Sequence, residues 1–362
     1  MRTSAVTLAL VVALACACGR TPESKPEARA PSAPPTTPGA SAGVPSAPAG
    51  RASGPATSFR LPASPRVVAI GDIHGDLVAL RAALRLAGAI DSDDHWIGKD
   101  LTVVQVGDQI DRGDQDREVL DVLEALEASA KAGGGALHVL NGNHELMNAS
   151  FDFRYVTRKS FASFDEFSSR AGQLAGHLPE LELGRAAAFM PGAPYALKLS
   201  RHLTVALVGD SLFAHGGVRP AHVDYGLDRI NREASAFLTG KARELPSVLT
   251  DQSGPVWMRD YGGPEVDDAT CQALGRVLAQ VGAKRLIVGH TVQEHGISST
   301  CQERLFRIDI GLSAFYGLKP PQVLEVTASG ARVLGAGVTP DASTGSSSKP
   351  SKPGGSALHS GP

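Results

Sequence analysis

Five short apolar segments of this chain each end in a glycine beside an aspartate, an asparagine or a histidine. The segments are rich in β-branched residues, which is typical of buried strands. The junctions that follow them are GDIHGD at 71–76, GDQIDRGD at 107–114, NGNHE at 141–145, HGG at 215–217 and GH at 289–290. Ligands bind at the carboxyl ends of strands in open α/β sheets, and glycine lets the backbone turn sharply there. The pattern therefore predicts a sheet edge that gathers these polar side chains.

The spacing of apolar residues predicts strands and helices in alternation. Early strands are expected at 66–70, 101–106 and 136–140, separated by helices at 77–87 and 116–131. Later strands are expected at 203–208, 211–214, 285–288, 305–310, 323–326 and 332–334. Strand–helix–strand order implies parallel strands with helices packed on them. We expect an α/β fold of two packed mixed β-sheets flanked by helices, with a helical insertion at 149–195.

The two ends of the chain differ in composition from the middle. Arg2 precedes an apolar stretch at 6–17 that suits a signal peptide and is too short to span a membrane. Cys16 or Cys18 would be the lipidated residue of a bacterial lipoprotein; the alternative is a plain secreted protein cleaved after Ala17. We expect a signal peptide at 1–18, a disordered Pro/Ala-rich tether at 19–58, a folded domain at 59–338 and a disordered tail at 339–362.

Cys271 and Cys301 are the two cysteines of the folded domain. In an exported protein they could form a disulfide, worth about 3–4 kcal/mol in the chain-entropy model. The alternative is that Cys271 belongs to an ordinary helix core, because it lies at helical spacing from Leu274, Leu278 and Val281. The sequence leaves both readings open.

The junction residues offer carboxylate and amide oxygens and imidazole nitrogens, without a thiolate. Such a donor set suits Mn, Fe or Zn. Six donors that share one bridging carboxylate would hold two divalent ions roughly 3.5–4 Å apart, an arrangement used in phosphate chemistry. The net charge of −2 and the absence of a basic stripe argue against nucleic acid as a partner.

The blocks GDIHGD, GDQIDRGD, GNHE, FAHGG and VGH resemble the signature blocks of the calcineurin-like metallophosphoesterases, and more narrowly those of the phosphoprotein phosphatase superfamily. The resemblance covers most of residues 66–312, with the blocks in the same order. GNHELMNASFDFRYVT at 142–157 and GPVWMRDYGG at 254–263 are similar to the Shewanella-like protein phosphatases. The fold that the resemblance implies is the two-sheet sandwich of the calcineurin-like metallophosphatases.

The resemblance also implies a role for each junction residue. It implies six metal ligands, which are Asp72 and His74 for one ion, Asn143, His215 and His290 for the other, and Asp108 between the two. His144 would be the general acid, oriented by Asp111, and Arg112 and Arg259 would hold the phosphate oxygens. Tyr316 is a further candidate for substrate contact, and Asp76 and Glu145 are expected to cap helices or support the ligands.

The function expected from these residues is hydrolysis of phosphate monoesters of proteins, at phosphotyrosine, phosphoserine or phosphothreonine. A hydroxide that bridges two ions, Mn²⁺ or alternatively Fe or Zn, would attack phosphorus directly, because no Cys or Ser nucleophile motif is present. One alternative is a hydrolase of small phosphates such as dinucleoside tetraphosphates, and another is a non-catalytic phosphate-binding lipoprotein. We expect an exported protein, periplasmic or anchored to a membrane only by its lipid, whose insertion at 149–195 lies over the active site and influences substrate choice.

Overall fold

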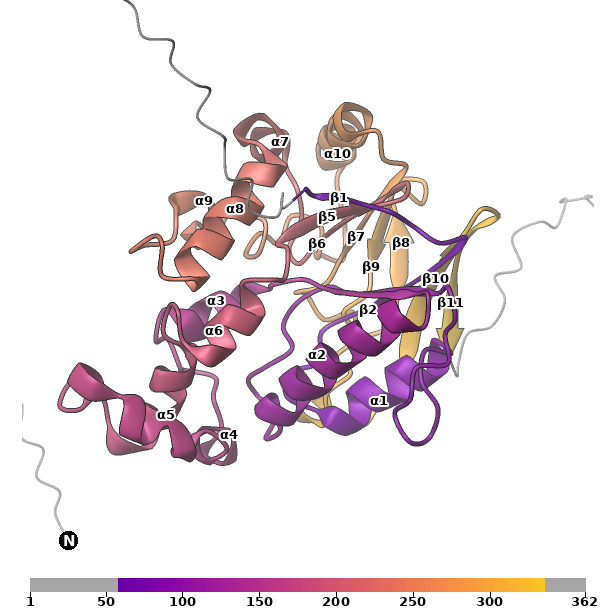
Figure 1. Cartoon of the computed structure of the whole chain (residues 1–362). Helices are drawn as coiled ribbons and strands as arrows, with labels where there is room; N and C mark the ends of the chain where they lie inside the picture. The colour runs from indigo at the N-terminus through magenta and orange to yellow at the C-terminus, as the bar shows by residue number, and fades with distance from the viewer. Residues whose placement is uncertain (1–57, 336–362) are drawn as a thin grey trace, which may run out of the picture. The chain divides into compact units, whose positions relative to one another are not determined.

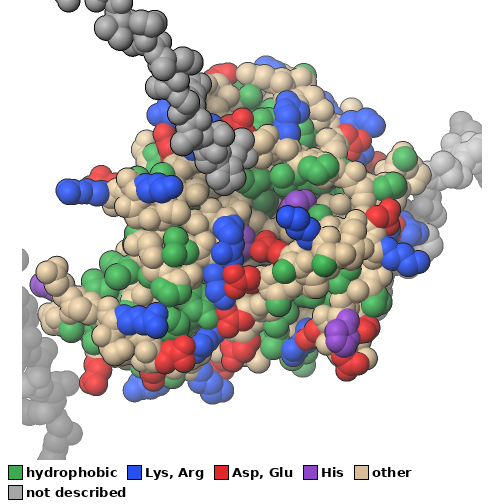
Figure 2. Space-filling view, in the orientation of Figure 1, with side chains coloured by type: hydrophobic (Ala, Val, Ile, Leu, Met, Phe, Trp, Pro, Cys, Tyr) green, Lys and Arg blue, Asp and Glu red, His purple; other side chains and the backbone are tan. Residues whose placement is uncertain are grey.

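The computed structural model describes residues 58–335, which form two β-sheets packed face to face with helices on their outer sides (Figure 1). The predicted fold class is confirmed. The signal peptide, all but the last residue of the tether, and the tail lie outside the described residues. Among the residues described, no helix combines the length and the apolar character needed to cross a membrane. On the face shown in Figure 2, acidic and basic side chains are interspersed.

The first sheet has five strands in the order β11-β10-β2-β3-β4. Its strands are β2 (Arg66–Ile70), β3 (Thr102–Gln105), β4 (Ala136–Val139), β10 (Gln322–Thr327) and β11 (Gly330–Gly335). β2, β3 and β4 are parallel, and β10 runs antiparallel to both β2 and β11. Helices α1 (Leu77–Leu86) and α2 (Asp116–Ala132) make the crossovers between the parallel strands and cover the outer face of the sheet.

The second sheet has six strands in the order β1-β5-β6-β7-β9-β8. Its strands are β1 (Arg60–Leu61), β5 (Val205–Val208), β6 (Ser211–Ala214), β7 (Arg285–Val288), β8 (Ser298–Thr300) and β9 (Leu305–Arg307). The predicted hairpin of β5 and β6 is confirmed by their antiparallel pairing. The sequence did not indicate β1 and β8, which are only two and three residues long.

Strand β2 shows how the sequence divides the core into layers. Val68 and Ile70 face α1 and α2, whereas Val67 and Ala69 face the second sheet. Because successive side chains of a strand point to opposite faces, a strand buried on both sides is apolar throughout. The layer between the sheets is completed by aliphatic and aromatic side chains such as Val104, Phe213 and Ile287 from the neighbouring strands.

Four helices lie in the part of the chain that forms the second sheet. They are α7 (Pro220–Tyr225), α8 (Leu227–Leu238), α9 (Ser247–Thr250) and α10 (Asp268–Val281). Helix α10 begins at the N-cap Asp267, whose side chain accepts from Thr270 N, and ends at Gly282, whose φ of 73° suits glycine. Cys271 of α10 forms a disulfide with Cys301, which follows β8, so of the two readings left open by the sequence the disulfide is the one found.

The segment 149–195 is helical, as predicted. Together with the residues on either side it contains α3 (Asn143–Ala149), α4 (Arg158–Ala162), α5 (Glu180–Phe189), α6 (Pro194–Leu199) and the 3₁₀ turns Asp165–Arg170 and Gly172–Leu174. Its own small core is aromatic, with the ring of Phe164 packed edge-on against Phe189 and Tyr195. A third 3₁₀ turn, Ala314–Tyr316, lies close to the end of the described chain.

Candidate active site

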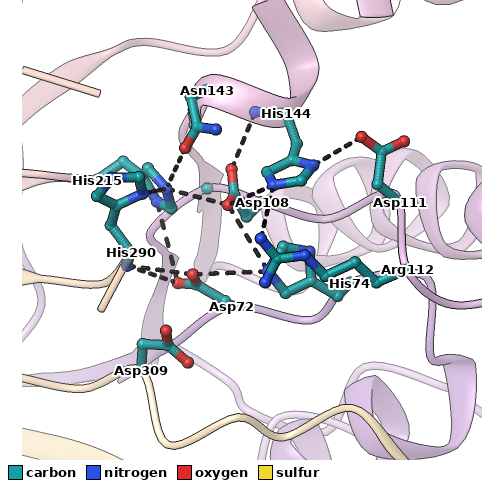
Figure 3. Close-up of polar contacts among 12 residues, drawn as sticks. Asp72, His74, Asp108, Asp111, Arg112, Asn143, His144, His215, His290 and Asp309 are labelled. Carbon is teal, nitrogen blue, oxygen red and sulfur yellow. Dashed lines mark hydrogen bonds and ion pairs between the residues drawn. The ribbon is translucent and has the colours of Figure 1, made fainter. Parts of the chain in front are cut away.

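The loops that follow β2, β3, β6 and β7 meet the first turn of α3 at one edge of the two sheets (Figure 3). All six predicted metal ligands lie in this cluster, and each is at most 8% exposed. The cluster therefore joins residues from both sheets. The structure brings together every ligand that the sequence pattern proposed.

The turns that carry these side chains are unusually tight. His74, Asp108, Asp111, Arg112 and His290 all adopt left-handed backbone conformations, with φ between 48° and 70°. L-residues rarely adopt this conformation, so surrounding contacts must hold it.

Two glycines leave room for the buried carboxylates. A Cβ at Gly142 would lie 2.2 Å from Asp108 Oδ1, and a Cβ at Gly289 would lie 2.2 Å from Asp72 Oδ1. Neither distance is possible between real atoms. This explains why a glycine precedes the ligands that follow β4 and β7.

Three histidines each use one ring nitrogen to bind a backbone carbonyl. Nδ1 of His74 lies 3.1 Å from Ile110 O, Nδ1 of His215 lies 3.0 Å from Val106 O, and Nε2 of His290 lies 3.0 Å from Trp257 O. A carbonyl can only accept, so these nitrogens donate their proton. The second nitrogen of each ring faces the cluster, and in a neutral imidazole that nitrogen carries a lone pair. Burial lowers the pKa of His74 to about 3 and that of His290 to about 2, which keeps both rings neutral.

Asp108 occupies the centre of the cluster. Its Oδ2 lies 3.2 Å from His215 Nε2, 3.7 Å from His74 Nε2 and 3.6 Å from His144 Nε2. His74, Asp108 and His144 form one compact group of donor atoms, and Asp108, His215 and His290 form another. Asp108 belongs to both groups, which is the position expected of a bridging ligand.

A third aspartate of the cluster, Asp309, lies beside Asp72, and the sequence pattern did not single it out (Figure 3). Burial raises the pKa of Asp309 to about 6. Burial and the charges of Asp309 and Asp108 raise the pKa of Asp72 well above its ordinary value. Asp309 follows β9 just as the other site residues follow their strands, but no glycine precedes it in the sequence IDIG. The sequence predicted a strand over 305–310, which placed Asp309 inside it, whereas β9 ends at Arg307. A charged residue in the middle of that apolar stretch was the one signal that could have revealed it.

The donor set fits bound divalent cations. His215 Nε2 and His290 Nδ1 face each other at 3.1 Å. In each neutral ring the one N–H group donates to a backbone carbonyl, so both facing nitrogens are acceptors. Asn143 Oδ1, a further acceptor, lies 3.1 Å from the same nitrogen of His215. Such facing acceptors repel one another, and so do the buried carboxylates of Asp72, Asp108 and Asp309. A cation among them removes both sources of repulsion.

His144 lies at the edge of the cluster and pairs with Asp111. Its Nδ1 is 2.6 Å from Asp111 Oδ2, and both side chains are buried. Burial alone would lower the pKa of His144, but the carboxylates of Asp108 and Asp111 outweigh it and raise the pKa. The ring thus holds a proton more tightly than a free imidazole does, and its Nε2 lies 3.6 Å from Asp108 Oδ2.

The two predicted phosphate-binding arginines lie near different histidines. Arg112 Nη2 is 3.3 Å from His144 Nε2, and its guanidinium packs against the rings of Tyr155, Phe315 and Tyr316. Arg259 is exposed and donates from Nη1 to the backbone oxygen of His290, 2.9 Å away. Each guanidinium thus flanks a part of the cluster.

Comparison with known proteins identifies the molecule that carries this site. Residues 65–294 match the model of the family described as "Calcineurin-like phosphoesterase". The chain belongs to the calcineurin-like phosphoesterase family. It is therefore an enzyme, and its His and Asp side chains are positioned for a metal site.

Relatives of this phosphoesterase include plant and protist proteins. "Shewanella-like protein phosphatase 2" of Arabidopsis thaliana is 38% identical over 301 residues, covering 74% of this chain and 77% of that protein. "Shewanella-like protein phosphatase 1" of Plasmodium berghei is 29% identical, covering 72% and 71%. A cold-active protein tyrosine phosphatase of known structure aligns with a TM-score of 0.61 and 25% identity, covering 74% of this chain and 75% of that one. These comparisons confirm the resemblance to the Shewanella-like phosphatases.

The two acidic residues expected to have supporting roles have them in this phosphoesterase. Glu145 accepts from the backbone N–H groups of Asp108, Gln109 and Gly142 at 2.7–2.9 Å, and so holds the tight turn after β3. Asp76 caps α1 by accepting from Ala79 N and also accepts from the backbone N–H of Ala314.

Arg185 is a buried residue of the phosphoesterase site that the sequence reading missed. It belongs to α5, and its guanidinium contacts Asp111 at 3.0 Å. The predicted insertion therefore reaches the residue that orients His144. Its start also reaches the site, because the Tyr155 ring packs 5.0 Å from the ring of His144.

Proposed function

We propose that this phosphoesterase is a two-metal phosphoprotein phosphatase that hydrolyses phosphate monoesters of tyrosine, serine or threonine side chains. The observation that carries the proposal is the His144–Asp111 pair, held at 2.6 Å beside a cluster of metal donors and a guanidinium. Monoester hydrolysis needs a proton for the leaving oxygen and cations for the phosphate, and this arrangement offers both. The names of the relatives support a protein substrate.

The proposed ligands are those that the sequence implied, with Asp72 and His74 on one side of Asp108 and Asn143, His215 and His290 on the other. When bound, two divalent ions supply a water of lowered pKa and offset the charge of the phosphate. Manganese is our proposed ion, because imidazole nitrogens and carboxylate oxygens suit it and no thiolate is present. Arg112 and Arg259 would bind phosphate oxygens through their planar forks of N–H donors.

His144 would supply the proton to the leaving oxygen. Asp111 keeps Nδ1 occupied, so the proton that the ring gives away would be the one on Nε2, which lies 3.6 Å from Asp108 Oδ2. The Arg112 guanidinium, a donor 3.3 Å from the same nitrogen, would turn toward the phosphate when that proton is present. A phosphate oxygen bound by Arg112 would place the ester oxygen within reach of this nitrogen. General acids of this kind contribute about 10²–10⁴-fold to the rate.

The surroundings of Arg112 favour a phosphotyrosine substrate. Its guanidinium carbon lies 5.2 Å from the Tyr155 ring centre, 5.9 Å from that of Phe315 and 5.4 Å from that of Tyr316. Phe315 is 61% exposed, so its ring is free to stack on a substrate ring. The hydroxyl of Tyr316 has no partner among the described residues and could donate to the substrate. A structural relative is titled a protein tyrosine phosphatase.

A substrate panel tests the proposed function. Purified enzyme with Mn²⁺ is given p-nitrophenyl phosphate, phosphotyrosine, phosphoserine and phosphothreonine peptides, and dinucleoside tetraphosphates. We expect turnover of the peptides, fastest for phosphotyrosine. Faster turnover of the dinucleotides would favour the small-phosphate alternative, and metal-loaded enzyme that hydrolyses nothing would favour the phosphate-binding alternative.

We also propose that the protein is exported and anchored by lipid at Cys16 or Cys18. The apolar stretch at 6–17 and the Cys271–Cys301 disulfide support export, because disulfides persist in oxidising compartments. Mass spectrometry of the protein from its native host should find a diacylglyceryl group on one of these cysteines. An unmodified Met1 at the N-terminus of the cellular protein would contradict the proposal.

A further inference from the structure

The side chain of Arg185 is the hub of a buried polar network. It donates from Nε to Asn148 Oδ1 at 2.6 Å, from Nη1 to Ser160 Oγ at 2.8 Å, and from Nη2 to both Asp111 and Asp116 at 3.0 and 2.7 Å. All five residues are fully buried. The ring centre of Phe164, the residue just before the 3₁₀ turn Asp165–Arg170, lies 5.2 Å from the guanidinium carbon, and that of Phe189 lies 5.0 Å from it. The network therefore fixes the plane of the guanidinium.

Within this network the two oxygens of Asp111 have different partners. Oδ1 accepts from Arg185 Nη2 and from Asn148 Nδ2, while Oδ2 faces His144 Nδ1. Figure 3 shows the Asp111 side chain directed toward the His144 ring. Rotation of the carboxylate would break the two bonds at Oδ1. The donors at Oδ1 therefore determine the direction in which Oδ2 points.

Arg185 also supports the backbone of Asp111 indirectly. Asp116 Oδ1 accepts from the backbone N–H of Asp111 at 2.9 Å, and Asp116 Oδ2 accepts from Arg185. Asp111 has a φ of 70°, a conformation that needs such support. One guanidinium thus restrains both the backbone and the carboxylate of the residue that orients the proposed acid.

We propose that Arg185 is a positioning residue for proton donation: it holds Asp111 so that His144 Nε2 is directed at the leaving oxygen. The inference rests on the proposed role of His144. It assigns to the insertion a part in the chemistry, in addition to the predicted part in substrate choice. A lysine cannot replace this arginine, because an ammonium lacks the planar fork that reaches several acceptors together.

The test compares Arg185→Lys and Arg185→Met with the control Arg117→Met. Arg117 also joins α2 to the insertion, by donating to Ser163 O and to Glu166 at 2.8 Å, but it is not a partner of Asp111. The kcat and KM of each variant are measured for aryl and alkyl phosphates of increasing leaving-group pKa. Residues that orient a ligand through another residue typically cost about 10–100-fold. We expect such a loss of kcat for alkyl phosphates and a small loss for p-nitrophenyl phosphate, with unchanged KM and metal content.

The control should keep the wild-type dependence on leaving-group pKa. Equal slowing of every substrate by the Arg185 variants, or no slowing, would overturn the inference. If Arg185→Met does not fold, Arg185→Lys and Asn148→Ala carry the test, because Asn148 donates to the same oxygen of Asp111.

A double variant separates this inference from the proposed function. If Arg185 acts through His144, then His144→Asn/Arg185→Lys should be no slower than His144→Asn alone. If the fold-loss in kcat of the double variant equals the product of the two single losses, Arg185 acts independently of His144, and the inference is wrong. If His144→Asn slows all leaving groups equally, the general acid itself is wrong and the inference falls with it. If His144→Asn depends on the leaving group and Arg185→Lys does not, the inference alone is wrong.

Discussion

At the scale of single residues, we expect substitution of Asp108 to affect metal binding and turnover more than any other change at the site. Its Oδ2 is near three imidazole nitrogens, and it belongs to both groups of donor atoms. In Asp108→Asn a neutral amide replaces the charge between the two proposed ions. We expect bound metal to fall and turnover of p-nitrophenyl phosphate to drop by more than about 100-fold, since even residues behind the ligands cost about 10–100-fold. Steady-state kinetics and elemental analysis measure both; two metals per chain with near-normal turnover would refute the assignment.

His144 gives a prediction of a different kind, because the loss of rate in a variant without it should depend on the leaving group of the substrate. An alkoxide leaving group needs a proton most, a tyrosine phenolate with a pKa of about 10 needs it less, and p-nitrophenolate least. His144→Asn should therefore slow phosphoserine peptides most and p-nitrophenyl phosphate least, with metal content unchanged. Plots of log kcat against leaving-group pKa compare the variant with the wild type. Parallel lines would show that His144 does not donate the proton.

At the scale of elements, the disulfide joins helix α10 to the chain that follows β8. It closes a loop of 30 residues, for which the chain-entropy model gives a contribution of about 3–4 kcal/mol. The double variant Cys271→Ser/Cys301→Ser should lower the free energy of unfolding by this order. Guanidinium unfolding of the variant and of the oxidised wild type measures the difference. Addition of reductant should weaken the wild type and leave the variant unchanged, and equal stability of the two proteins would contradict the prediction.

Which elements the sequence could predict depends on how local their signals are. The strand ends at Asp72, Asp108 and His290 were predicted because an apolar run, a glycine and a polar residue lie within a few positions of each other. Strand β1 was not, because Arg60 and Leu61 form a strand only through their pairing with Leu207 and Val208.

The same limit applies to the site. The ligands are marked by their position after a strand, whereas Arg185 lies 74 positions from Asp111 and in a helix that has no motif. Only packing of the insertion against α3 and the loop after β3 brings the two together. Sequence reasoning therefore found the side chains that the structure gathers into the candidate site, but it missed Asp309 and it missed Arg185, which contacts Asp111 from the far side of the cluster.

At the scale of the whole molecule, stability should depend on a carboxyl group outside the active site. Glu127 of α2 lies 3.7 Å from the buried His202, and burial raises the pKa of Glu127 to about 7 against the opposing effect of Arg201. Between its ordinary pKa of 4.5 and about 7, the unfolded chain releases this proton and the folded chain keeps it. The contribution of Glu127 to the free energy of unfolding therefore falls as the pH rises through this window, and only a comparison with a variant that lacks this carboxyl isolates it from the groups that titrate in the opposite direction, such as His202.

Glu127→Gln removes this titration. The variant should be more stable than the wild type above pH 7 by an amount on the order of 2–3 kcal/mol, and the difference should shrink toward pH 4.5. Urea unfolding at several pH values measures both curves. Parallel curves over this range would show that Glu127 keeps its ordinary pKa in the folded chain.

The left-handed turns of the active site have a consequence for how this enzyme can change under selection. His74, Asp108, Asp111, Arg112 and His290 each hold a conformation that costs an L-residue about 1–2 kcal/mol and costs glycine almost nothing. Glycine at any of them would relax the backbone and remove a side chain of the catalytic centre. In a laboratory population selected only for heat resistance, glycine should therefore appear at these positions except at Asp111, where it would leave the buried Arg185 guanidinium without one of its two carboxylate partners. Each such substitution would remove part of the proposed catalytic centre.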